Sequence, residues 1–223
     1  VADGAGIDNA YNLGVAAKAT IISSTIQDNI ANVGGGVNNA GEFWLLNSLV
    51  YSNTAGLGGG LRNWNDAGQI GDLHVINSTV SGNRADQDGG GLYNEGDGTT
   101  AVLGSSTVFG NLSLIGNSGN LYSINGTIIL SNSIVASPLN LNNANCEGSI
   151  VSDGYNLDTD NTCGLGAGEK RGITNPLIDS LKDNGGPTLT HALLSGSPAI
   201  DASPVCEPTD QRGVPRPDGI ACD

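Results

Sequence analysis

Three copies of a triple-glycine motif constrain the fold of this chain more than any other feature. Residues 34–39 read GGGVNN, residues 58–63 read GGGLRN and residues 89–94 read GGGLYN, and a degenerate copy at 119–122 reads GNLY. Glycine adopts positive φ angles readily and allows a close backbone approach that a Cβ atom would prevent. We therefore predict that these copies form one corner of a repeated coil, with Gly35, Gly59 and Gly90 at its centre.

Two further motifs recur in phase with the glycines. Segments 23–29, 47–53, 77–83 and 105–111 read SSTIQDN, NSLVYSN, NSTVSGN and SSTVFGN, and a fifth copy at 132–136 (NSIVA) lacks the final asparagine. A short apolar run completes each unit at 43–46, 73–76, 101–103 and 128–130. Each unit therefore offers three short strands separated by turns.

Units of this length predict an all-β fold, a right-handed parallel β-helix of about five to six coils. Stacking the coils about 4.8 Å apart lets each strand pair with its copies above and below. One inward column is then aliphatic: Ile26, Val50, Val80, Val108 and Val135. A corner ladder is expected from Asn29, Asn53, Asn83 and Asn111, because asparagine tolerates the left-handed conformation. A β-sandwich is the alternative, but it would need three in-phase motifs by coincidence.

The pattern breaks near Cys163, so we expect repeats over 1–163 and a different segment over 164–223. The second segment is rich in proline, which cannot donate to a sheet ladder. It is therefore predicted to wrap or cap the solenoid, whose open end needs a cover.

The four cysteines lie in the last part of the chain, and two sequential pairs would close loops of similar size, Cys146–Cys163 and Cys206–Cys222. Their spacing does not match a zinc site. Disulfides indicate an oxidising environment and an extracellular or cell-surface location.

Three C-terminal motifs carry a family resemblance: DNGGPT at 183–188, HALLSGSPAID at 191–201 and TDQRG at 209–213. They resemble the end of bacterial choice-of-anchor Q domain proteins. The coils are similar to those of the same family and to the repeats of polymorphic outer-membrane proteins. The resemblance implies a bacterial surface or secreted protein, and it implies no known reaction.

The charge and the scattered acidic groups limit the function. The formal net charge of −14 repels phosphate backbones, so nucleic acid is not an expected partner. No apolar stretch is long enough to span a membrane. The best acidic cluster is Asp86, Asp88 and Asp97, a calcium candidate whose alternative is solvated turn aspartates. The loop with Asp158 and Asp160 is open to the same two interpretations.

Basic groups and aromatic side chains bear on catalysis and sugar binding. Up to Asp160 the only basic residues are Lys18, Arg62 and Arg84, and no facing set of carboxylates accompanies them, so the sequence favours a non-catalytic protein. Both histidines are expected to be structural. Four aromatic residues are candidates for a carbohydrate-binding surface: Trp44, Tyr51, Trp64 and Tyr93. Strand alternation must turn Phe43 or Trp44 inward, however, and this favours a core role for these aromatic residues.

Together these features predict a non-catalytic, secreted or cell-surface structural or adhesive module. Its expected partners are copies of itself or other cell-surface proteins, with polysaccharide as a further candidate. One alternative is a carbohydrate-binding or calcium-stabilised matrix protein. Another is a polysaccharide lyase or hydrolase.

Overall fold

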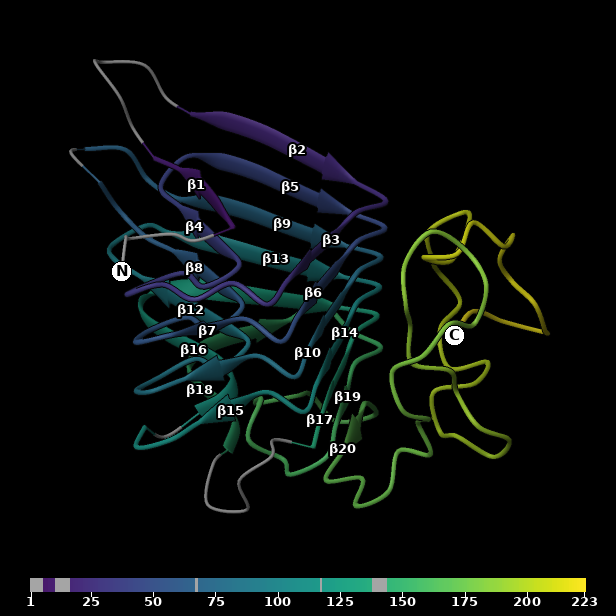
Figure 1. The fold of residues 1–223 in the computed structure, drawn as a ribbon. Helices are drawn as coiled ribbons and strands as arrows, with labels where there is room; N and C mark the ends of the chain where they lie inside the picture. The colour runs from purple at the N-terminus through teal and green to yellow at the C-terminus, as the bar shows by residue number, and fades with distance from the viewer. Residues whose placement is uncertain (1–5, 11–16, 67, 117, 138–143) are drawn as a thin grey trace.

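A computed structural model describes residues 6–10, 17–66, 68–116, 118–137 and 144–223. The described residues form no helix. Their strands pair in parallel and wind into a β-solenoid of about five turns (Figure 1). The predicted parallel β-helix is confirmed.

The three repeated motifs supply three stacks of strands. The triple-glycine motif forms the first stack: β1 (Ile7–Asn9), β4 (Val37–Asn39), β8 (Leu61–Asn63) and β12 (Leu92–Glu95). The apolar run forms the second: β2 (Lys18–Ile22), β5 (Glu42–Leu46), β9 (Asp72–Ile76) and β13 (Thr100–Gly104). Two longer strands run through both stacks and join them into a ten-stranded sheet: β16 (Ser118–Ser131) and β18 (Ala144–Ser152).

The third motif forms a seven-stranded sheet: β3 (Thr25–Gln27), β6 (Leu49–Tyr51), β10 (Thr79–Ser81), β14 (Thr107–Phe109), β17 (Ile134–Ala136), β19 (Leu157–Asp158) and β20 (Lys170–Arg171). Three two-residue strands that the motifs do not predict follow the corner asparagines: β7 (Thr54–Ala55), β11 (Arg84–Ala85) and β15 (Leu112–Ser113). Strand β20 pairs with β19, so sheet pairing continues past Cys163.

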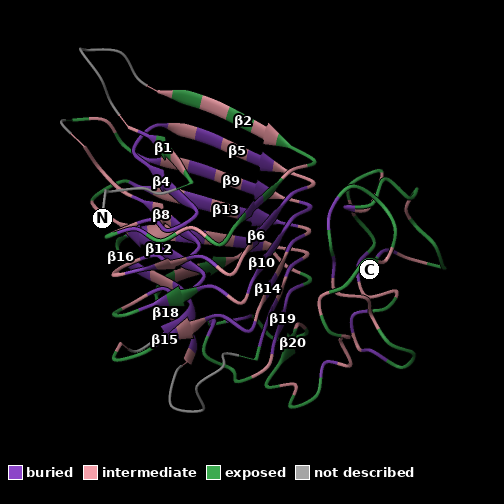
Figure 2. Ribbon diagram, viewed as in Figure 1, coloured by how far each residue is buried: buried purple, intermediate pink, exposed green. Residues whose placement is uncertain are grey.

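The apolar core fills the space between the sheets. The predicted aliphatic column is in register from Ile26 to Val135, and all its members are buried. Buried and less buried positions alternate along the strands (Figure 2). A fully buried Val or Leu side chain stabilises a fold by about 1.5–3 kcal/mol, so stacking identical positions concentrates that gain along one axis.

The corners use positive φ angles at positions other than the expected ones. The ladder asparagines were expected to be left-handed, but positive φ falls on the residue before each of them: Asp28, Ser52, Gly82 and Gly110. The bend is thus complete one residue early, and the asparagine side chain turns into the interior. In the triple glycines the first residue has positive φ. The middle ones (Gly35, Gly59 and Gly90) lie so close to backbone of the adjacent coil that a Cβ atom would overlap it.

After β20 the chain forms only isolated bridges and lies along the outer side of the seven-stranded sheet (Figure 1). It is attached there by side chains. Gln211 Oε1 accepts a hydrogen bond from Thr79 Oγ1 (2.7 Å), and Gln211 Nε2 donates one to the Ser48 carbonyl (3.1 Å). The segment, which we call the C-terminal strap (172–223), therefore covers a side of the solenoid and not an end.

Candidate functional site

The corner asparagines form a buried ladder along the solenoid axis. The amide Nδ2 of each donates to Oδ1 of the next, from Asn29 to Asn53 (2.9 Å), then to Asn83 (3.0 Å) and to Asn111 (2.9 Å). The fifth copy of the motif lacks the final asparagine, and Asn120 accepts the next hydrogen bond of the ladder in its place. Asn120 stands where the third glycine stood in the earlier copies, and sequence reasoning missed this replacement.

A second amide ladder was also missed. The final asparagine of each triple-glycine motif points inward, as does Asn9 in the coil before them. Nδ2 again donates to Oδ1 of the next coil, from Asn9 to Asn39, Asn63 and Asn94, and Asn94 Nδ2 donates to Ser123 Oγ. The signal was present, because this asparagine recurs in phase with the glycines.

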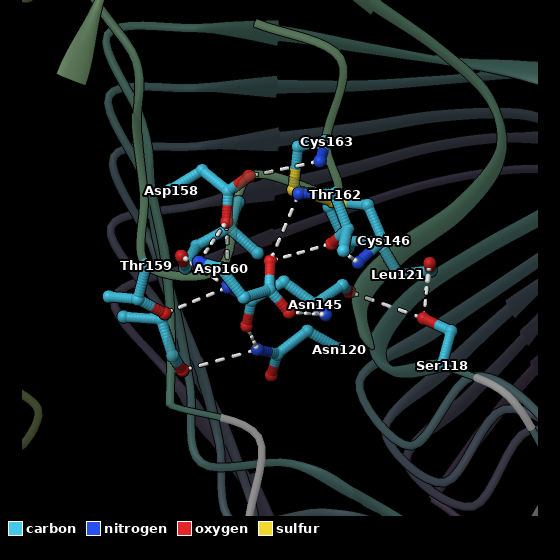
Figure 3. Close-up of a disulfide and its surroundings, with 12 residues drawn as sticks. Ser118, Asn120, Leu121, Asn145, Cys146, Asp158, Thr159, Asp160, Thr162 and Cys163 are labelled. Atoms are coloured by element: carbon cyan, nitrogen blue, oxygen red, sulfur yellow. Dashed lines mark hydrogen bonds between the residues drawn. A yellow bond between two sulfur atoms is a disulfide. The ribbon is translucent and has the colours of Figure 1, made fainter. Parts of the chain in front are cut away.

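The first ladder ends on an aspartate at the C-terminal end of the core (Figure 3). Asn120 Nδ2 donates to Asn145, whose Nδ2 donates to Asp158 Oδ1 (2.7 Å). Asp158 pairs in register with Val135, so a carboxyl group occupies the next level of the aliphatic column. Its second oxygen accepts a hydrogen bond from the backbone N–H of Cys163 (2.9 Å). Burial raises the pKa of the Asp158 carboxyl.

The neighbouring Asp160 is held by the same loop. Its carboxylate accepts hydrogen bonds from the Asn145 backbone N–H (2.7 Å) and from Thr162 Oγ1 (2.7 Å). Burial opposes its ionisation, but these hydrogen bonds keep its pKa below the usual range. Both carboxyl groups are thus bound by protein donors, which favours a structural role for this loop.

The Cys146–Cys163 disulfide closes this end of the core (Figure 3). Cys146 is in register with Leu121 and extends its inward column, and both half-cystines are buried. The second disulfide, Cys206–Cys222, lies within the C-terminal strap. Both expected pairings are therefore present.

The three calcium candidates are not brought together. Asp86 lies after β11 and pairs with Arg84 (3.3 Å), and Asp88 lies beside Gly116. Asp97 follows β12, where its carbonyl oxygen accepts a hydrogen bond from Asn65. Among the residues with a described placement, no three His, Cys, Asp or Glu side chains converge on a point that could hold a metal ion.

The outer face of the first stack carries a row of charged and aromatic side chains. In register along the axis lie Asn38, Arg62, Tyr93, Tyr122 and Glu147. The Tyr93 and Tyr122 rings stack with their centroids 5.4 Å apart. The Arg62 guanidinium forms an ion pair with Glu95 and lies 4.2 Å from the centre of the Trp64 ring.

A shallow hollow of about 370 Å³, the Trp64 hollow, opens beside this row; it is lined by Trp64, Asn65, Tyr93, Glu95, Gly96, Ile124 and Asn125. The indole N–H of Trp64 and the side-chain oxygen of Asn65 are buried there, with no hydrogen-bond partner among the described residues. Burial, and next the nearby Glu95 carboxylate, to which the hydroxyl is hydrogen-bonded, raise the pKa of the Tyr93 hydroxyl. Neither atom is exposed to solvent, so a ligand hydroxyl, which both donates and accepts, pairs with the Trp64 N–H and the Asn65 oxygen only when the loop at residues 64–65 moves.

The aromatic residues singled out in the sequence lie mostly outside the core. Phe43 is the residue that points inward, and it is fully buried. Trp44 points outward and stacks on His74 at 3.8 Å, so the core role expected for it is wrong. Tyr122 was missed, although it occupies the Tyr93 position in the degenerate motif copy.

Fold and site define a parallel β-solenoid stabilised by two disulfides, with a polar and aromatic hollow on one outer face. No protein-family model, curated protein or solved structure matches the chain. In the part of the chain that the structure describes, no helix is long and apolar enough to cross a bilayer.

Proposed function

We propose that this chain is a non-catalytic adhesive module of a secreted or cell-surface protein, and that it holds carbohydrate in the Trp64 hollow. Two disulfides support an oxidising location. The C-terminal motifs at 183–188, 191–201 and 209–213 support a bacterial surface protein through their resemblance to choice-of-anchor Q domain proteins.

The unused donor and acceptor in the hollow carry this proposal. A buried polar group without a partner costs about 1–3 kcal/mol, and a ligand that pairs with it recovers this cost. Trp64 Nε1 and Asn65 Oδ1 lie beside the apolar surface of Tyr93 and Ile124. Hydroxyl groups next to an apolar ring face are the chemistry of a sugar.

The charges of the lining support adhesion over catalysis. Tyr93 and Glu95 lie on β12, whose inner side is tied by the second amide ladder, whereas Trp64 and Asn65 lie in the loop after β8. Arg62 and Glu95 neutralise each other in an ion pair, and Tyr93 keeps its proton. These groups bind and orient a ligand without a proton transfer.

The test is binding of the purified chain to a panel of immobilised neutral glycans. Trp64→Phe keeps an aromatic ring and removes the N–H donor, so we expect about tenfold weaker binding, the equivalent of about 1.4 kcal/mol. Trp44→Phe, an outward tryptophan on the second stack, is the matched control and should bind like the wild type. Equal binding by the two variants, or no retained glycan, would contradict the proposal.

A further inference from the structure

A cleft separates the C-terminal strap from the seven-stranded sheet. The strap touches the sheet at β10, where Ser81 and His191 lie 2.9 Å apart. It touches it again near β17, where Ser203 donates to Asn132 (2.7 Å). Between these attachments a cleft of about 350 Å³ is lined by Thr107 of β14 and Ile134 of β17. Small-molecule sites typically measure about 300–1,000 Å³.

Arg216 gives this cleft a guanidinium that forms no ion pair with any carboxylate of the described residues. Its Nη1 donates to Asn77 Oδ1 (2.9 Å) and to the Thr209 carbonyl (3.3 Å). Within the described parts of the chain, no carboxylate forms an ion pair with it, and its Nε and Nη2 make no hydrogen bond. A guanidinium stays charged in proteins, and partial burial makes that charge costly without an anion.

Three carboxylates, those of Asp210, Asp223 and Glu207, attract the Arg216 guanidinium at longer range without forming an ion pair with it. Asp210 accepts hydrogen bonds from Arg212, and its charge is neutralised there. Asp223 Oδ1 accepts the backbone N–H of Asp201 (2.7 Å). Nε and Nη2 of Arg216 therefore remain free to bind a ligand carboxylate.

The remaining lining has an apolar part and charged groups of both signs. Ile134, Ala199, Ala202 and Val214 form the apolar part. Lys170 and Arg212 are further cations of the lining, and Asp210, Asp218 and Asp223 are its carboxylates. We propose that this cleft binds a small organic carboxylate, with the carboxylate paired to Arg216 and an apolar body against Ile134 and Ala202. This site is separate from the Trp64 hollow and does not depend on it.

The test compares three probes by isothermal titration calorimetry: 3-phenylpropionate, its amide and acetate. The acid has both the charge and the apolar body, whereas each of the others lacks one. We expect the acid to bind at least tenfold more tightly than either. Equal binding of acid and amide, or no binding of any probe, would overturn the proposal.

Three variants locate the site. Arg216→Gln removes the cation and should abolish the preference for the acid over the amide. Arg171→Gln, an exposed arginine of β20 that is not part of the cleft, should bind like the wild type. Because Arg216 also holds Asn77, a second variant is needed: Thr107→Leu fills the cleft and leaves the Arg216 contacts in place. Unchanged binding by Thr107→Leu would place the ligand elsewhere and refute the assignment.

Discussion

Single side chains tie each coil to the next through the interior. Asn83 shows how completely an amide is used there. Its Oδ1 accepts from the backbone N–H and the Nδ2 of Asn53, and its Nδ2 donates to the Val50 carbonyl and to Asn111 Oδ1. In an apolar interior such a network stabilises only when every member is satisfied. The ladder therefore fixes the register of the coils as well as their spacing.

Asn83→Ala should lower the free energy of unfolding by about 3 kcal/mol or more, because several buried groups lose their partner at once. Asn29→Ala is the matched control at the half-buried end of the same ladder, with an expected loss of about 1 kcal/mol. Chemical denaturation of both variants measures the difference. Similar small losses of stability in both variants would show that an asparagine in the middle of the ladder stabilises the fold no more than one at its end.

At the scale of elements, the C-terminal strap is held by side chains and not by strand pairing. His191 is central to this attachment. Its Nδ1 lies 2.7 Å from the Asp179 carbonyl oxygen and therefore carries the proton, which leaves Nε2 to accept from Ser81 Oγ. Its ring packs 4.5 Å from the Phe109 ring. Burial of the ring favours the neutral imidazole in this arrangement.

Docking of the strap should weaken in mild acid. Burial lowers the pKa of His191 below its ordinary value of about 6.5. His191 then binds a proton more readily when the strap is undocked. The stability that neutral His191 gives to the docked strap is therefore complete above about pH 6.5, and it is lost as the pH falls toward the lower, folded-state pKa. Hydrogen exchange of residues 188–216 at pH 7.5 and pH 5.0, corrected for intrinsic rates, measures it. His191→Gln cannot titrate and should show a smaller change; the same change in both proteins would contradict this role.

At the scale of the whole molecule, each coil contacts only its neighbours, so stability should vary along the axis. The strands of the first coil are less buried than those of the middle coils: Ile21 of β2 is half-buried, whereas Val75 of β9, which lies in register with it through Leu45, is fully buried. The opposite end is closed by the Cys146–Cys163 disulfide. The middle coils have a neighbour on both sides.

Native hydrogen exchange should therefore be slowest in β8 to β14 and fastest in β2 and β3. Reducing the disulfides should speed exchange in β18 and β19, because the Cys146–Cys163 bridge restrains that end by about 3 kcal/mol in the chain-entropy model. Exchange in β9 and β10 serves as the internal control and should change little. Uniform exchange along the chain would show that the solenoid opens as one unit.

The repeat by itself determines the architecture of the coils. Copies in phase predict equivalent places in successive coils, so the aliphatic column, the asparagine ladder and the glycine corner were all expected at the right residues. Sequence copies adopt the same local conformation, and coils of the same conformation stack on one another along one axis. The places of the repeated residues therefore follow from the sequence.

Only the tertiary structure decided what happens where the repeat fails. Asn120 completes the ladder from a different motif, and Asp158 ends it inside the aliphatic column. The Trp64 hollow and the cleft beside Arg216 join residues from separate coils or from the strap. The physical reason is that a residue outside the repeat has no copy to fix its place. Its position is set by the packing and hydrogen bonds it finds among segments distant in sequence.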